Sequence, residues 1–260
     1  MEHSAGPPKT LPVDAADLAD RWRRARLAAL RSLVAWEPEA DELTLLGRLT
    51  TAEDSHEDPV SESEEAVDRA VLINSYRLGQ SLRRYLGRPL TLEEVAELLP
   101  RLGLPCVAAP FAIHEDHARL ERVGCPQGQL EGTCDYFRDA ISGLVHGLGE
   151  ELHHARHRSV GHGDPQCVDV IYRDAESLHR FGAIPPSMQE TLDQVVASVC
   201  RFDSRRRVRF LGLSEGVLYF QAEIAGAPEL AVAPAVQREV ARRLPTIRLV
   251  EVTPRPVLAD

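Results

Sequence analysis

Cysteine and histidine residues are concentrated in one part of this 260-residue chain. Four of the five cysteines and seven of the ten histidines fall between Cys106 and Cys167. Thiolate sulfur and imidazole nitrogen are the ligands that zinc and other transition metals prefer in proteins. A metal ion bound by such residues would require distant segments to meet at one point. The concentration therefore predicts a metal site first and nucleophilic catalysis second.

Composition and charge narrow the class of protein. Hydrophobic residues make up 43% and charged residues 27% of the chain, so most of it can bury a core, and its length favours two domains. The net charge of −10 argues against nucleic-acid binding, which requires basic surface. No apolar run reaches the roughly 20 residues of a membrane span, and the start lacks the apolar core of a signal peptide. We expect a cytoplasmic protein that binds small molecules or other proteins, neither nucleic acid nor membrane, in an oligomeric state that the sequence leaves open.

The cysteine count agrees with a reducing compartment. Five unevenly spaced cysteines are more typical of free thiols or metal ligands than of a disulfide framework.

The first 64 residues are predicted to contain a single helical segment. Residues 1–13 are rich in proline, serine and glycine and are expected to be disordered. Residues 14–50 form the helical segment, in which Asp14 caps an amphipathic helix. Residues 51–66 hold seven acids and no base, which favours a solvated loop, with its boundary placed at residue 64.

The next domain is predicted over residues 65–183. An apolar pattern from residue 65 to 86 indicates a long helix, and Thr91 with Glu94 forms a capping box for a shorter one. The apolar stretch 106–113 is short enough for a strand.

A further helix is predicted after Thr133, with Cys134 in its first turn. Gly143 and Gly147 each cost about 1 kcal/mol of helix stability relative to alanine. Both glycines therefore indicate that another backbone packs closely against this helix.

Two extended segments follow, 153–160 and 167–172, joined by a turn in which Asp164 is predicted to be a turn former rather than an acid with a chemical role. A hairpin here would bring His157 close to Cys167.

These elements define a candidate tetrahedral metal site. Its ligands would be Cys125, Cys134 and Cys167 with one histidine, His157 in the best position and His162 as the substitute. Zinc requires bonds of about 2.0 to 2.3 Å to every ligand, so the loop, helix start and hairpin would have to converge. The alternative is that the cysteines are small core residues and the histidines belong to a hydrogen-bonded surface.

Residues 65–175 resemble the vinyl-reductase-type fold. The resemblance rests on residues 122–126 (RVGCP), on Cys134 opening a helix, and on residues 159–172 (SVGHGDPQCVDVIY). This superfamily includes sensory domains of aromatic-responsive regulators and 4-vinyl reductase-like proteins, with the 2-amino-thiazoline-4-carboxylate hydrolase-like family as a nearby pattern. In its zinc-bearing members, one cysteine before the helix and one after the Gly-Asp turn bind the metal. The resemblance thus implies zinc bound by Cys134 and Cys167.

The same resemblance leaves the remaining ligands open. The family's first hairpin strand commonly supplies an acid and another cysteine, but this chain has Ser159 in that region, with His157 nearby. Zinc could therefore persist with histidine, or the site could be empty.

Residues 187–256 are predicted to form a small domain with the element order αββαβ. Ser187 and Glu190 would form a capping box for its first helix, and the other elements are 207–213, 217–224, 230–244 and 247–252. This order, with the sequence LPTIRLVEV, resembles the C-terminal domain of NifU-like iron–sulfur scaffold proteins. The CxxC pair of that family is missing, so the resemblance implies a protein-docking or dimerising module that binds no cluster.

The predicted fold class is α+β, with a helical N-terminal region packed on the vinyl-reductase-like domain and the αββαβ domain following. The predicted function is a non-catalytic, zinc-binding small-molecule sensor or metallocluster accessory protein, with a possible protein partner at the C-terminal domain. The alternative is a hydrolase of a small heterocyclic amide or thiazoline-like substrate, using a metal-bound water or Cys134.

Overall fold

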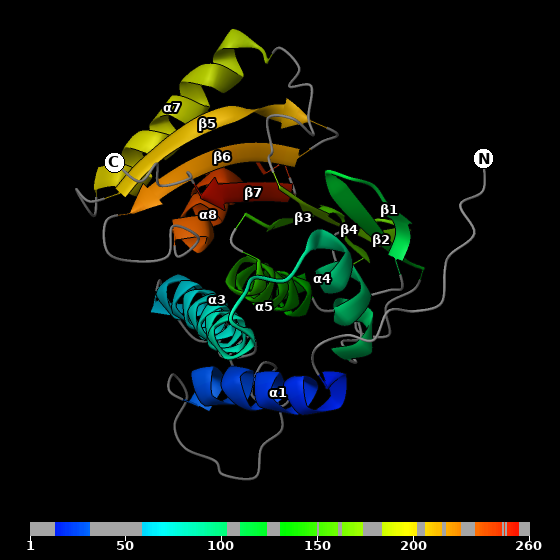
Figure 1. Ribbon diagram of the computed structural model, residues 1–260. Coiled ribbons are helices and arrows are strands. Elements are labelled where there is room, and N and C mark those ends of the chain that lie inside the picture. The colour runs from blue at the N-terminus through cyan, green and yellow to red at the C-terminus, as the bar shows by residue number, and fades with distance from the viewer. Residues whose placement is uncertain are drawn as a thin grey trace, which may run out of the picture.

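Helices and sheets are combined in an α+β fold (Figure 1). The computed structural model describes residues 14–31, 59–102, 110–123, 131–149, 151–160, 163–173, 184–201, 206–214, 217–224, 232–245, 247 and 249–254. None of the helices within these ranges is long and apolar enough to cross a membrane.

Three helices form a layer at one end of the molecule: α1 (Ala15–Arg31), α3 (Pro59–Leu86) and α5 (Glu131–Leu148). In Figure 1, α1 crosses below α3, and α5 lies between α3 and the strands. The buried Trp22 indole of α1 donates a 2.9 Å hydrogen bond to the Ser75 hydroxyl of α3. As expected, Asp14 caps α1, because its carboxylate accepts the Ala16 N–H at 2.9 Å.

Helices α3 and α5 pack backbone against backbone through the two predicted glycines. A Cβ atom added to Gly143 would lie 2.2 Å from the Leu72 carbonyl oxygen, and one added to Gly147 would lie 2.3 Å from the Tyr76 carbonyl oxygen. The expectation of a close backbone contact is therefore confirmed. This contact fixes the position of α5, which carries Cys134.

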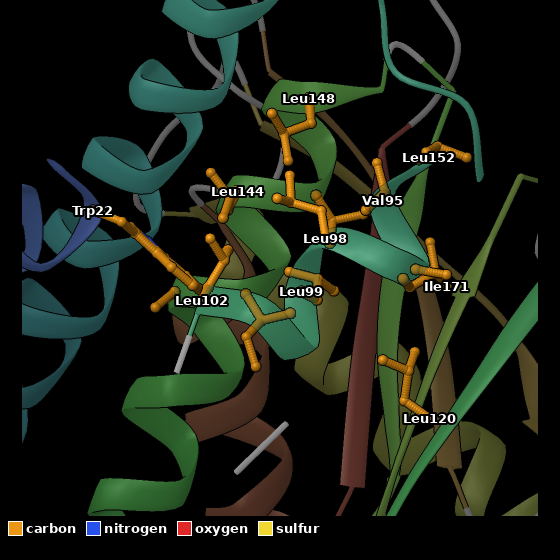
Figure 2. Packing of buried hydrophobic residues seen from close by; sticks show 14 of the residues in the cluster. Trp22, Val95, Leu98, Leu99, Leu102, Leu120, Leu144, Leu148, Leu152 and Ile171 are labelled. Carbon is orange, nitrogen blue, oxygen red and sulfur yellow. The ribbon is translucent and has the colours of Figure 1, made fainter. Parts of the chain in front are cut away.

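A four-stranded antiparallel sheet has the order β1-β2-β4-β3, with β1 (Pro110–Ile113), β2 (His117–Val123), β3 (His153–Arg158) and β4 (Gln166–Tyr172). Helix α4 (Leu92–Leu98) continues into the 3₁₀ turn η2 (Leu99–Leu102). Figure 2 shows side chains of α4 and η2 meeting Leu144 and Leu148 of α5 and Leu120 and Ile171 of the sheet in one apolar cluster. The predicted capping box is present: Thr91 accepts the Glu94 N–H, and the Glu94 carboxylate accepts the Thr91 N–H at 2.9 Å.

The C-terminal elements have the predicted order: α7 (Pro186–Arg201), β5 (Arg206–Ser214), β6 (Val217–Ile224), α8 (Ala233–Arg243) and β7 (Leu249–Pro254). Strand β6 lies between β5 (antiparallel) and β7 (parallel). Helices α7 and α8 share an apolar cluster with Leu218 and Phe220 of β6. Val217 and Tyr219 alternate with those residues and pack instead against Val168, Val170 and Tyr172 of β4.

The N-terminal boundary of α3 differs from the prediction. The helix begins at Pro59, inside the segment that was predicted to be an acidic loop. Proline suits the first turn of a helix because its missing N–H would have no partner there. Acidic residues near a helix N-terminus are favoured by the helix dipole, so the acids of 59–64 are compatible with a helix. The prediction weighed charge alone.

Three other elements also differ from the prediction. Strand β2 was not predicted, although the alternation of the buried Ala118 and Leu120 with charged residues is typical of a strand with one buried face. Helix α5 begins at Glu131, so Thr133 is not its cap. Helix α7 begins at Pro186, and the Pro185 carbonyl accepts the Met188 and Gln189 N–H groups, which displaces the predicted Ser187 cap.

Candidate functional site

The two cysteines implied by the resemblance lie in the interior. Cys134 is in the first turns of α5, and Cys167 is the second residue of β4. Both are free thiols with at most 2% of the residue exposed. The Val160 N–H donates to Cys167 Sγ at 3.4 Å. Hydrogen bonds of this kind support a cysteine sulfur that serves as a metal ligand.

The environment of Cys167 favours the neutral thiol. Burial has the largest effect and raises the pKa of Cys167, while the Val160 N–H and the Arg156 guanidinium act in the opposite direction. Asp169 and, last, Cys134 add smaller effects that raise the pKa of Cys167 further. A buried, protonated thiol is a poor nucleophile. A bound metal ion would nevertheless deprotonate it.

His157 lies in β3 at an irregularity of the register between Arg156 and Arg158. Its Nε2 atom is 2.8 Å from the Tyr219 hydroxyl of β6, and both side chains are buried. The histidine that was expected to complete the metal site is thus directed to the C-terminal sheet. Within the residues that the structure describes, no group of three histidine, cysteine or acidic side chains is placed to hold a metal ion.

The other two candidate ligands, Cys125 and His162, lie outside the described residues. The turn beside His162 is described in part. The Asp164 carboxylate accepts the Ser159 N–H at 2.9 Å, and the Asp164 N–H donates to the Ser159 carbonyl at 3.1 Å. Gly163 has a φ of +89°, which favours glycine. Asp164 is therefore a turn former, as predicted.

Ser159 directly follows the last residue of β3. Continuing the observed pairing of Arg158 with Val168 places Ser159 opposite Cys167. The Ser159 hydroxyl oxygen is buried and has no hydrogen-bond partner within the described part of the chain. A buried polar atom in this state is often satisfied by a water molecule or an ion.

A buried ion pair lies beside the thiols. Arg156 of β3 donates from Nε to Asp169 of β4 at 2.8 Å, and from Nη1 to the Cys134 carbonyl oxygen at 2.9 Å. Burial alone would raise the pKa of Asp169, but the Arg156 cation and a hydrogen bond from His154 hold it at about 2. Asp169 is therefore ionised at neutral pH.

A hydrogen-bonded chain extends from this pair to α5. His154 Nε2 is 2.9 Å from Asp169, and His154 Nδ1 is 2.8 Å from the Ser142 hydroxyl. Burial lowers the pKa of His154. The three residues have the composition of a serine–histidine–aspartate triad, but all are buried and the carboxylate is shared with Arg156. This arrangement joins α5 to the sheet and offers a substrate little access.

The sequence contained a signal for this network that the prediction did not use. Asp169 stands between apolar residues in the middle of β4, and Arg156 stands in the middle of β3. Because burying a lone charge is costly, an acid at such a place requires a cationic or hydrogen-bonding partner.

A second set of polar side chains connects α5 to the C-terminal elements. Arg138 of α5 pairs with the neighbouring Asp139 at 3.0 Å and donates to the Gln237 side chain of α8 at 2.7 Å. Together with the bond between His157 and Tyr219, it links the part that carries the thiols to the last five elements.

A column of rings fills the space between α3, α5 and the edge of the sheet. Tyr76 stacks on His146, His146 stacks on His153, and His153 lies against Tyr172, with ring centroids 5.3 to 5.6 Å apart. Burial lowers the pKa of His146 from 6.5 to about 4 and that of His153 to about 3. Both imidazoles are thus neutral at pH 7.

The chain matches no family model and no curated protein. The resemblances to the vinyl-reductase-type fold and to the NifU-like domain therefore stay predictions.

Proposed function

We propose that this protein is a non-catalytic binding protein, a small-molecule sensor or a metallocluster accessory factor, in which Cys134 and Cys167 hold a zinc ion. One observation carries the proposal: two buried thiols come from separate elements, α5 and β4, which Arg156 joins by hydrogen bonds to the Cys134 carbonyl and to Asp169, two residues after Cys167. When bound, zinc would cross-link the start of α5 to the hairpin of β3 and β4.

The donor chemistry of the described residues fits such an ion in part. Two sulfurs are present, one of them accepting an N–H bond, and the buried Ser159 hydroxyl has no hydrogen-bond partner among the described residues. A four-coordinate zinc ion requires two more ligands. The candidates are Cys125, two residues after the end of β2, and His162, two residues after Val160.

The environment of the histidines favours binding over hydrolysis. A cysteine or metal-bound water acting as nucleophile requires a nearby histidine with a ring nitrogen available as base. His154 uses both ring nitrogens, for Ser142 and Asp169, and His157 uses Nε2 for Tyr219. Both histidines therefore already have hydrogen-bond partners.

The proposal also includes the domain arrangement: a helical N-terminal region on a vinyl-reductase-like domain, followed by a NifU-like docking domain. Two contacts, the buried bond of His157 with Tyr219 and the part-buried bond of Arg138 with Gln237, support a C-terminal unit that responds to the state of the thiol-bearing part. A protein partner would bind through that unit.

Metal analysis of the purified protein tests this function. We expect about one zinc ion per chain, since two thiols within one site hold a single ion. Cys134→Ser and Cys167→Ser are each expected to lose the metal and keep their helix content by circular dichroism. Cys200→Ser is the matched control, because Cys200 is a free, half-buried thiol of α7, and it should keep the metal. Wild type that stays metal-free after zinc loading under reducing conditions would contradict the proposal.

A further inference from the structure

Two stacked imidazoles lie at the centre of the column of rings. His146, from the last turn of α5, stacks on His153, the first residue of β3, with ring centroids 5.6 Å apart. Tyr76 of α3 stacks on the first of these rings, and Tyr172 of β4 lies against the second. Each imidazole has a buried Nδ1 atom with no hydrogen-bond partner among the described residues. Most buried polar atoms in proteins are paired, so two such nitrogens on adjacent rings require an explanation.

The charges around the two rings favour the neutral imidazole. Burial has the largest effect on His146; the Leu152 backbone favours a proton on it, and the Arg83 guanidinium of α3 opposes one. For His153, burial acts together with His146 itself. Among the described groups that influence either ring there is no carboxylate. An imidazolium at this place would therefore be desolvated, and the charges that influence it would be other cations.

The same residues hold one end of α5 against its neighbours. Gly147 follows His146, and a Cβ atom added to it would lie 2.3 Å from the Tyr76 carbonyl oxygen of α3. His153 pairs with Tyr172 in the ladder of β3 and β4, and β3 is an edge strand of its sheet. A ring that moved out to water would thus separate α5 from α3 at this end and free the start of β3.

We propose that His146 and His153 form a proton-operated switch: uptake of a proton from solvent by either ring opens the junction of α3, α5 and β3, while the C-terminal sheet stays folded. Water solvates an imidazolium and the ring column does not, so acid favours the open form over the closed one. The opening is local, because it breaks contacts at one end of α5 only. It does not depend on a metal ion at the thiols.

Hydrogen exchange followed by mass spectrometry on the full-length protein measures this opening. Exchange rates at pH 7 and pH 5 are each divided by the intrinsic rate at that pH, which gives the protection of each peptide. The test peptides cover the end of α5 and β3, and the reference peptides cover α7 and β6. His114→Phe is the matched control, because His114 is an exposed histidine that stacks on another histidine, His117.

We expect the protection of the test peptides to fall between pH 7 and pH 5 by about 25-fold for each ring that is protonated only in the open form. The reference peptides should remain better protected than the test peptides at pH 5. The fall should be about 25-fold smaller than in wild type in His146→Phe and in His153→Phe, since each variant removes one ring. It should be unchanged in His114→Phe.

Equal protection of the test peptides at pH 7 and pH 5 in wild type would overturn the switch. So would equal protection of test and reference peptides at pH 5, because the rings would then reach water only when the whole chain unfolds. The two phenylalanine variants are independent, so one suffices where the other fails to fold. A folded variant that keeps the full wild-type fall would show that the proton is taken up elsewhere, which also overturns the proposal.

Discussion

Lowering the pH from 7 to 5 is expected to decrease the free energy of unfolding by about 4 kcal/mol through His146 and His153 alone. The folded-state pKa values are about 4 and about 3, below the ordinary 6.5, so the unfolded chain binds more protons in this range. The free energy of unfolding therefore rises with pH. Each of the two histidines lowers it by about 2 kcal/mol as the pH falls from 6.5 to 5. His154, whose pKa is also lowered, adds in the same direction.

Urea titrations at pH 5, 6 and 7 measure this dependence. His146→Phe and His153→Phe keep a ring in the column but cannot take up a proton, so each should remove about half of the pH effect. Tyr76→Phe, which changes the same column without changing a group that titrates between pH 5 and 7, is the control and should keep the slope. Parallel slopes in wild type and both histidine variants would show that these imidazoles are not held neutral by burial.

Replacing Gly143 by alanine is expected to decrease the free energy of unfolding by about 3 kcal/mol. The added Cβ would meet the Leu72 carbonyl oxygen at 2.2 Å, and backbone cannot move aside as a flexible side chain can. Gly147→Ala meets the Tyr76 carbonyl oxygen in the same way. Alanine is better than glycine in a helix by roughly 1 kcal/mol. We expect the packing lost when α3 and α5 are pushed apart to cost more than this gain.

Gly87→Ala is the matched control for these substitutions. Gly87 has a φ of +69° and no atom within contact distance of an added Cβ, so only backbone strain of about 1 kcal/mol is expected. Chemical denaturation monitored by circular dichroism gives the three values. Gly143→Ala and Gly147→Ala proteins as stable as wild type would contradict the close backbone contact.

Local signals in the sequence were sufficient to predict much of the fold. The capping box of Thr91 and Glu94 depends on residues three apart. The spacing of Gly143 and Gly147 in α5 is visible in the sequence even before the helix that packs against them is known. The order of the last five elements followed from apolar periodicity. The start of α3 was missed because its acidic residues suggested a loop, although acids are compatible with a helix N-terminus. No element was predicted for β2, although alternating charged and apolar residues are compatible with a strand.

The site was less predictable, because its contacts join elements that are distant in the sequence. Cys134 and Cys167 were expected to be interior residues close to each other, and both are buried. His157 was expected to face the thiols, but a register irregularity and the hydroxyl of Tyr219, 62 residues later, determine its position. The ring column and the three bonds of Arg156 likewise require the relative placement of α3, α5, β3 and β4, which no local pattern encodes.

X-ray absorption at the zinc edge tests the central claim most directly. Zinc-loaded wild type is predicted to show at least two sulfur scatterers at about 2.3 Å, the ordinary zinc–sulfur distance, whereas Cys134→Ser, which loses the ion, should retain no sulfur-bound zinc. A first shell of nitrogen and oxygen alone would contradict a zinc ion held by Cys134 and Cys167.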